Sequence, residues 1–290
     1  SSRFDNDVQV EEQDQENWIA DPELTSRFKL TEDIAAAYSS FSLKLNAKTD
    51  VKVGLRYEYT RTNLGSVEQP DVVDRRYGSW FPSAYLSRTI SEHQSANLSY
   101  SRRIMRPGFT QLAPYLIFSD PTTLEGGNPA LQPSFTNSVK FDYRIKSWQF
   151  SVEYSKEDES IRDIPVIDHV KNTQFNRPEN VGNSEGVFAS LFFQLHPAKW
   201  WDMQNNLFGV HQRADFQYEV NSLKLKNVFF GVNSTQSFTL PKAFSLEVSA
   251  NFFSPGYWGV YKWNPNGNLS IGVQKKLSEK WGTLNLNVND

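Results

Sequence analysis

The chain has 290 residues, a formal net charge of −3 and no cysteine. This length suits one large β domain or two ordinary ones, and the charge provides no electrostatic basis for binding nucleic acid. Disulfides and thiolate metal sites are excluded by the absence of cysteine. The mean hydropathy of −0.57 does not exclude a membrane protein, because a membrane β-barrel places lipid-facing residues at every second position.

Alternation of apolar and polar residues predicts β-strands along most of the chain. Val51, Val53 and Leu55, for example, point to one side of a strand, while Lys52 and Arg56 point to the other. Several such segments run to ten residues or more, and a tilted strand needs roughly 9 to 11 residues to cross a bilayer. In chain order, the twelve predicted strands lie near residues 29–46, 50–63, 76–89, 94–105, 134–146, 148–159, 184–196, 200–213, 224–238, 243–254, 263–276 and 281–290.

The connections between these strands alternate between short and long. Short turns are predicted at 47–49, 90–93, 146–147, 196–199, 240–243 and 277–280. Long loops are predicted at 64–75, 106–133, 160–183, 214–223 and 255–262. Outer-membrane barrels have short periplasmic turns and long extracellular loops, whereas a soluble sandwich has no reason to place its tight turns on alternate hairpins. The alternation therefore favours an all-β, antiparallel up-and-down barrel.

A soluble antiparallel sandwich is the alternative, because periodicity does not show whether the apolar face points inward or outward. Two observations favour the barrel. The polar faces carry charged residues suited to a water-filled interior, among them Lys44, Arg56, Glu58, Arg144, Glu153 and Glu247. Aromatic residues flank the short turns, as in an interfacial girdle, at Trp148, Trp200, Trp201, Phe244 and Trp281.

The segment from residue 100 to residue 143 resembles the middle of a TonB-dependent outer-membrane receptor barrel. It is most similar to the outer membrane protein beta-barrel family that is common in Bacteroidetes. One departure is Ser134, where that family usually has an acidic residue. The matching residues are Arg102, Arg103, Arg106, Pro107, Leu112, Pro114, Asp120, Pro121, Gly127, Asn128, Pro129, Leu131 and Pro133.

The similarity continues downstream and covers the chain from about Asn17 onward, including Asn180, Gly182, Glu185 and the turn around Lys199. The resemblance implies a transmembrane barrel of about 22 strands in the bacterial outer membrane, of which this chain supplies about twelve. Residues 1–290 are then expected to be part of one barrel domain. The N-terminal plug domain, its TonB-contacting box and the C-terminal strands of such receptors are expected to lie outside these residues.

We find no catalytic or metal-binding constellation in the sequence. The four histidines, His93, His169, His196 and His211, are scattered, and none pairs with another at the spacing of metal ligands. The sequence therefore predicts neither an enzyme nor a metal site, and no cofactor.

Aromatic residues in the long loops are the candidates for ligand contact. Loops carry function on rigid scaffolds, and exposed aromatic side chains anchor sugars, siderophores and peptides. Alternatively, these residues belong to an outer girdle or brace neighbouring loops. Five prolines between residues 107 and 133 are expected to stiffen the longest loop over the barrel mouth. The candidates are Tyr115, Phe118, Tyr257, Trp258, Tyr261 and Trp263.

The resemblance implies the barrel portion of a TonB-dependent receptor that actively takes up a scarce nutrient, which would be a siderophore, an oligosaccharide or a peptide. Its expected partners are outer-membrane lipid and, through the plug, the TonB complex. A receptor-like barrel that acts as a scaffold in a surface complex with lipoproteins is the alternative. No nucleic-acid partner is expected.

Overall fold

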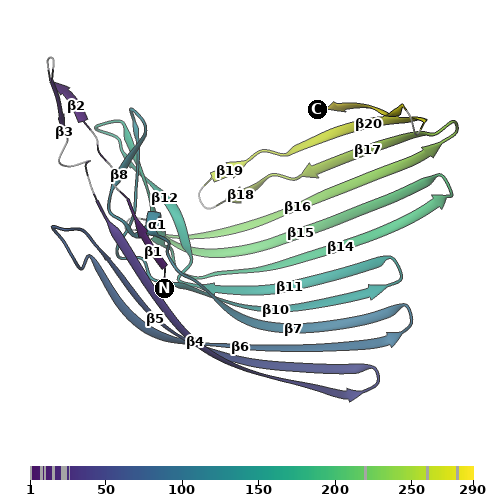
Figure 1. Cartoon of the computed structure of the whole chain (residues 1–290), viewed down its shortest axis with the longest axis horizontal. Helices are drawn as coiled ribbons and strands as arrows, with labels where there is room; N and C mark the ends of the chain where they lie inside the picture. The colour runs from purple at the N-terminus through teal and green to yellow at the C-terminus, as the bar shows by residue number, and fades with distance from the viewer. Residues whose placement is uncertain are drawn as a thin grey trace.

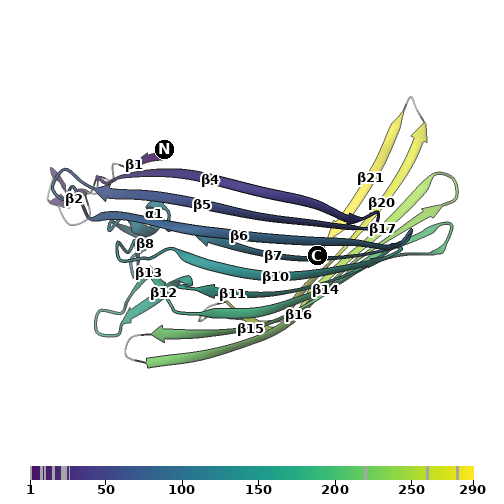
Figure 2. The same cartoon turned by 90° about the horizontal axis from the view of Figure 1, so that it is seen from below.

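The computed structural model describes residues 2–6, 9, 11–14, 17–20, 25, 27–218, 221–258, 261–278 and 281–290. In these residues one antiparallel sheet of thirteen strands dominates, and its strands neighbour one another in chain order. Figures 1 and 2 show this sheet as a curved wall. The strands are β1 (Ser2–Asp5), β4 (Lys29–Asn46), β5 (Thr49–Gly65), β6 (Val73–Ser91), β7 (Gln94–Met105), β10 (Ser134–Ile145), β11 (Trp148–Asp158), β14 (Ser184–Ala198), β15 (Trp201–Tyr218), β16 (Asn221–Leu240), β17 (Phe244–Phe253), β20 (Asn266–Ser278) and β21 (Gly282–Asn289).

All twelve predicted strands are confirmed, and β1 is added at the edge beside β4. The short turns lie together at one end of the strands and the longer connections at the other (Figure 1). No helix in the described ranges is long and apolar enough to cross a membrane.

The predicted loop at 214–223 is wrong. Strands β15 and β16 continue as a paired ladder as far as Tyr218 opposite Asn221, and residues 219 and 220 lie outside the described part of the chain. In the sequence, Phe216 and Tyr218 alternate with polar residues, so the strand pattern continues for more residues than are needed to cross a bilayer. The two strands can stay paired beyond the membrane, because hydrogen bonds between strands do not require lipid.

The cross-strand register separates an apolar face from a polar face. Residues directly opposite one another in a sheet share a face, so each row can be followed from strand to strand. Many side chains in these rows are exposed although they are large and hydrophobic, as expected where lipid is the solvent. One such row is Leu43, Val51, Leu86, Leu98, Phe141, Val152, Ala189, Gly209 and Phe230.

Aromatic residues gather beside the short turns, as the sequence predicts. Trp148 stacks on Phe193 with 4.6 Å between ring centroids, and Trp201 lies 5.7 Å from Phe238. Trp200 extends this second group, at 6.2 Å from Trp201. Such a band marks the periplasmic membrane interface, where ring systems have one apolar and one hydrated side.

The two longest loops contain secondary structure of their own. Loop 106–133 contains the short helix α1 (Phe109–Leu112) and strands β8 (Leu116–Asp120) and β9 (Thr123–Gly126). Loop 160–183 contains β12 (Ile161–Asp168) and β13 (Thr173–Asn180). These strands form one four-stranded sheet in the order β12-β13-β9-β8, which we call the loop sheet. Smaller hairpins are formed by β2 (Glu11–Asp14) with β3 (Asn17–Ala20) and by β18 (Gly256–Trp258) with β19 (Tyr261–Trp263).

Loop 106–133 folds back onto the polar face of the barrel wall. Leu112 and Leu131 are fully buried together with Leu30 of β4 and Leu64 of β5. Leu30 lies opposite Leu64, in phase with the polar residues of these strands. Because the interior of an outer-membrane barrel is polar, this apolar cluster places the loop inside the barrel mouth. Burial of apolar surface, together with the prolines, accounts for an ordered loop of this length.

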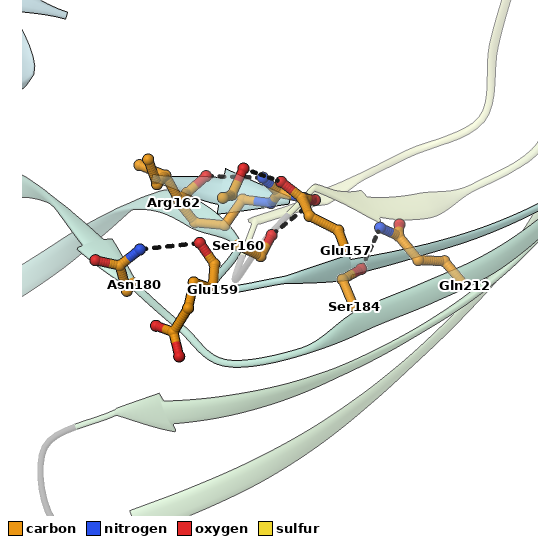
Figure 3. Close-up of polar contacts among 9 residues, drawn as sticks. Glu157, Glu159, Ser160, Arg162, Asn180, Ser184 and Gln212 are labelled. Atoms are coloured by element: carbon orange, nitrogen blue, oxygen red, sulfur yellow. Dashed lines mark hydrogen bonds and ion pairs between the residues drawn. The ribbon is translucent and has the colours of Figure 1, made fainter. Parts of the chain in front are cut away.

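Asn180 joins the two long loops through its side chain. Its Oδ1 accepts the Gln132 N–H at 2.7 Å, and its Nδ2 donates to the Gln132 carbonyl at 3.0 Å. The Nδ2 also donates to the Glu159 carbonyl at 2.9 Å (Figure 3). We expect Asn180→Ala to weaken the docking of the loops by about 2 kcal/mol, since each hydrogen bond contributes about 1 kcal/mol. Hydrogen exchange of residues 128–133 measures the change.

Asn176→Ala is the matched control for this prediction. It lies on the same strand, and the one hydrogen bond described for its side chain comes from Gln174, two residues away. Exchange that accelerates equally in both variants would contradict a specific joining role for Asn180.

Candidate functional site

An ionic cluster fixes the start of loop 106–133 to the barrel wall. The Arg106 guanidinium donates to the Glu58 carboxylate at 2.5 Å and to the Thr60 hydroxyl at 3.1 Å. Arg56 makes a second ion pair with Glu58, also at 2.5 Å. The end of the loop is held by Arg75, whose guanidinium donates to backbone carbonyls of the segment 129–131. Both ends of the loop are therefore bound to the polar face.

A group of aromatic rings lies on the polar face next to these loops. Phe208 is its centre, at 6.0 Å from Phe188, 6.4 Å from Phe229 and 5.9 Å from Phe253. Trp263 completes the group with an edge contact to Phe229 at 5.2 Å. We call these five residues the aromatic patch. Apolar rings on a mostly polar face deviate from the pattern of barrel interiors, and aromatic surfaces are typical of ligand pockets.

A cavity of about 290 Å³ lies against the aromatic patch. Phe188, Phe229 and Trp263 line its apolar side, and Glu157 and Gln212 line its polar side. The site therefore combines ring faces, a carboxylate and an amide, which suits a ligand with both an apolar surface and hydrogen-bond donors.

The carboxylate of Glu157, which lines this cavity, is held by three neighbouring side chains. Its Oε1 accepts the Ser134 hydroxyl at 3.1 Å, while its Oε2 accepts the Ser160 hydroxyl at 2.9 Å and the Arg162 guanidinium at 3.0 Å. Figure 3 shows this network beside the pair formed by Gln212 and Ser184. Ser134, at the position where the family usually has an acidic residue, is fully buried in this network as a hydrogen-bond donor. A second carboxylate there would repel Glu157.

The hairpin β18–β19 is positioned by hydrogen bonds to the wall. Asn227, which is buried, donates to the Tyr257 carbonyl at 2.8 Å and accepts its N–H at 3.0 Å. The indole N–H of Trp263 donates to the Ser254 carbonyl at 3.0 Å. Gly256 lies so close to the Trp263 ring that an added Cβ would be 2.3 Å from it. These contacts orient Tyr257 and Trp263 at the first cavity.

A second cavity, of about 460 Å³, lies between the loop sheet and the hairpin β18–β19. Tyr115 and Tyr261 line it from two different loops, and Glu125, Asp163 and Asn176 supply polar atoms. Burial raises the pKa of the Tyr115 phenol, so this group remains neutral at physiological pH. Neutral phenols, amides and carboxylates can orient a polar ligand by hydrogen bonds.

Four of the six predicted contact residues line one of the two cavities. Tyr257 and Trp263 line the first cavity, and Tyr115 and Tyr261 line the second. Phe118, 53 % exposed, lines neither of these two cavities, and the side chain of Trp258 lies outside the described part of the chain. Tyr115 is only 7 % exposed and packs in the loop core against Phe109, so bracing is one of its roles. Ligand contact stays a prediction for all six residues.

Sequence reasoning missed the strand members of the aromatic patch. Pairs of adjacent aromatic residues, Phe229-Phe230 and Phe252-Phe253, were the available signal. Since neighbouring side chains in a strand point to opposite faces, one member of each pair must point into the polar interior.

Gly231 leaves room for the centre of the aromatic patch. A Cβ at this position would lie 2.3 Å from the Phe208 ring. We expect Gly231→Val to displace that ring and to lower the thermal midpoint of barrel unfolding by about 5 °C, as overpacking costs about 2 kcal/mol. Gly209→Val is the control, because its Cβ would meet only a carbonyl oxygen at 4.0 Å. Equal midpoints for the two variants would contradict the close packing of the patch.

The described residues contain no group of three or more His, Cys, Asp or Glu side chains that could hold a metal ion. His196 is paired with Asp202 at 2.7 Å near a short turn.

Solved structures of receptors have the same fold. The chain is similar to the ferric yersiniabactin uptake receptor FyuA of Yersinia pestis, with a TM-score of 0.59, 12 % identity, and coverage of 91 % of this chain and 41 % of FyuA. For the siderophore receptor PirA of Acinetobacter baumannii, the TM-score is 0.54 and the identity 14 %, with coverage of 96 % of this chain and 48 % of PirA. For the ferric enterobactin receptor PfeA of Pseudomonas aeruginosa, the TM-score is 0.52 and the identity 15 %, with coverage of 94 % of this chain and 50 % of PfeA. No curated protein matches the sequence significantly.

The chain spans half or less of the length of these three receptors. The likeness shows that the chain has the fold of one wall of such a β-barrel, and the titles of all three neighbours call them receptors. A sequence profile of the outer membrane protein beta-barrel family matches residues 1–290. The chain belongs to this family, and its place is the bacterial outer membrane.

Proposed function

We propose that this chain is the barrel portion of a TonB-dependent receptor that takes up a scarce nutrient across the outer membrane. The observation that carries the proposal is the aromatic patch with its cavity, which lies on the polar face beneath loops folded into the barrel mouth. The fold shared with siderophore receptors supports it. A siderophore, an oligosaccharide and a peptide all remain candidate ligands, since each presents ring or apolar surface together with polar groups.

The proposal assigns a partner to each surface. The apolar face contacts outer-membrane lipid, and energy comes from the TonB complex through a plug domain expected outside these residues. Tyr257 and Trp263 are proposed as ligand contacts together with Phe229, because all three line the same cavity.

Uptake by intact cells tests this function. A strain that lacks the gene is compared with a complemented strain for uptake of labelled ferric siderophores, oligosaccharides and peptides, with and without a protonophore. We expect one class to be taken up only by the complemented strain and only with an energised inner membrane. Phe229→Ala should lower that uptake at least tenfold, whereas Phe230→Ala, on the apolar face, should not. Normal uptake of all classes without the gene, combined with loss of surface lipoproteins, would favour the scaffold function instead.

A further inference from the structure

A row of basic residues follows the apolar belt on the outer face of the barrel. Tyr154, Val187, His211 and Val228 lie opposite one another and form the last belt row toward the long loops. Two residues further along each strand, the next row on the same face is Lys156, Glu185, Arg213 and Lys226. Lys224 follows opposite Asp215.

The depth of this row places it at the level of the outer-leaflet headgroups. Ten residues of β15 separate Trp201, in the periplasmic girdle, from His211. Strands rise by about 3.3 Å per residue and tilt by about 40°, so ten residues span about 25 Å, which is the height of the apolar band in such barrels. Arg213 therefore lies just outside the hydrocarbon layer, where the lipid headgroups begin.

The cations of this row are available to a ligand. Arg213, Lys224 and Lys226 are exposed, and none of them takes part in the ion pairs of the described residues. Lys156 is paired with Asp158 at 3.4 Å, and Glu185 accepts the Tyr154 hydroxyl at 3.0 Å.

These side chains enclose a cavity of about 380 Å³. Lys156, Arg213, Lys224 and Lys226 line it with two carboxylates, Glu185 and Asp215, so positive charge is in excess. A guanidinium binds phosphate oxygens through two parallel hydrogen bonds, and ammonium groups add point charges. The guanidinium and ammonium groups of this cavity therefore favour an anion with several oxygen atoms.

We propose that this cavity binds the phosphorylated headgroup of an outer-leaflet glycolipid. The cavity opens on the face that carries the lipid belt, directly above exposed apolar side chains such as Val228 and Phe230, which are 68 % and 53 % exposed. Acyl chains of the same molecule would lie along these residues, which a free phosphate cannot do. Basic clusters at the membrane surface attract anionic headgroups. The site is independent of any transport function.

Lipid that remains bound to the full-length protein tests the proposal. The protein is purified from its own outer membrane in mild detergent, and bound phosphorylated glycolipid is counted by native mass spectrometry. The triple variant Arg213→Gln/Lys224→Gln/Lys226→Gln should retain at least fivefold less. Lys48→Gln/Arg88→Gln/Lys199→Gln removes the same charge at the short-turn end and should retain as much as wild type. Heat-modifiable gel migration verifies that each variant is a folded barrel.

Defined lipids distinguish the headgroup from other anions. After removal of bound lipid, a bisphosphorylated lipid A should bind to the wild-type protein. Added salt should weaken this binding, because the interaction is ionic. Lipid A without its phosphates should bind at least tenfold more weakly. Equal binding of that phosphate-free lipid, or unchanged retention by the triple variant, would overturn the proposal. Pyrophosphate that binds as tightly as the lipid would assign the site to a free anion and overturn it as well.

Discussion

Substituting Glu58 with glutamine is expected to release loop 106–133 from the barrel wall. The Glu58 side chain is 10 % exposed and pairs with both Arg106 and Arg56. Its loss leaves the Arg106 guanidinium, 17 % exposed, without an anionic partner beside a second cation. Breaking a buried ion pair at one partner costs about 3 kcal/mol, because the remaining charge stays desolvated. The loop should then open roughly a hundredfold more often.

Hydrogen exchange of residues 107–115 in the folded barrel measures this opening. Glu247→Gln is the matched control, because Glu247 also lies on the polar face but is exposed and makes none of the described ion pairs. Arg106→Gln should have a smaller effect than Glu58→Gln, since Glu58 keeps its pair with Arg56. Exchange in the Glu58 variant that matches the Glu247 variant would rule out the ionic anchor.

Leu112→Ala is expected to destabilise the same loop through its apolar core. Leu112 is 1 % exposed and packs with Leu131 and with Leu30 and Leu64 of the wall. Truncation of a fully buried leucine costs about 3 kcal/mol, from lost transfer free energy and from the cavity that remains. Limited proteolysis of the folded barrel should therefore cut loop 106–133 about a hundredfold faster.

Ile117→Ala serves as the control for this second prediction. Ile117 lies in the same loop, on β8, but its side chain is 45 % exposed, so its removal leaves no closed cavity. If both variants are cut at the wild-type rate, the loop is not held by the buried cluster. If the proposed uptake function is correct, Leu112→Ala should also weaken ligand binding, because Tyr115 of the same core lines the larger cavity.

The two anchors act on different parts of one loop. The ionic cluster at Glu58 holds its start, and the apolar cluster around Leu112 holds its middle. The Asn180 side chain then connects the end of this loop to its neighbour. If the proposed uptake function is correct, a ligand that enters the barrel mouth meets loops that are already ordered, which reduces the conformational entropy lost on binding.

Local sequence determined the wall of this protein. Strands such as 50–63 and 148–159 were predictable because each side chain has only two directions in a strand, and one of the two faces lipid. The short turns and the girdle at Trp148 and Trp201 follow from the same periodicity. The hairpin at 214–223 was wrongly predicted to be a loop because several of its residues are polar, as in loops exposed to solvent. Its strand structure depends on pairing with the partner strand.

Only the tertiary structure decided the contents of the barrel mouth. Loop 106–133 has no periodicity, and its residues find their partners on distant strands, such as Arg106 on Glu58 and Leu131 on Leu64. The aromatic patch likewise forms from β14, β15, β16 and β17 and from hairpin β18–β19, so Phe229 and Trp263 become neighbours through strand register and loop folding. Periodicity reports the direction of a side chain relative to its own strand, whereas a binding site depends on contacts between segments that are far apart in the chain.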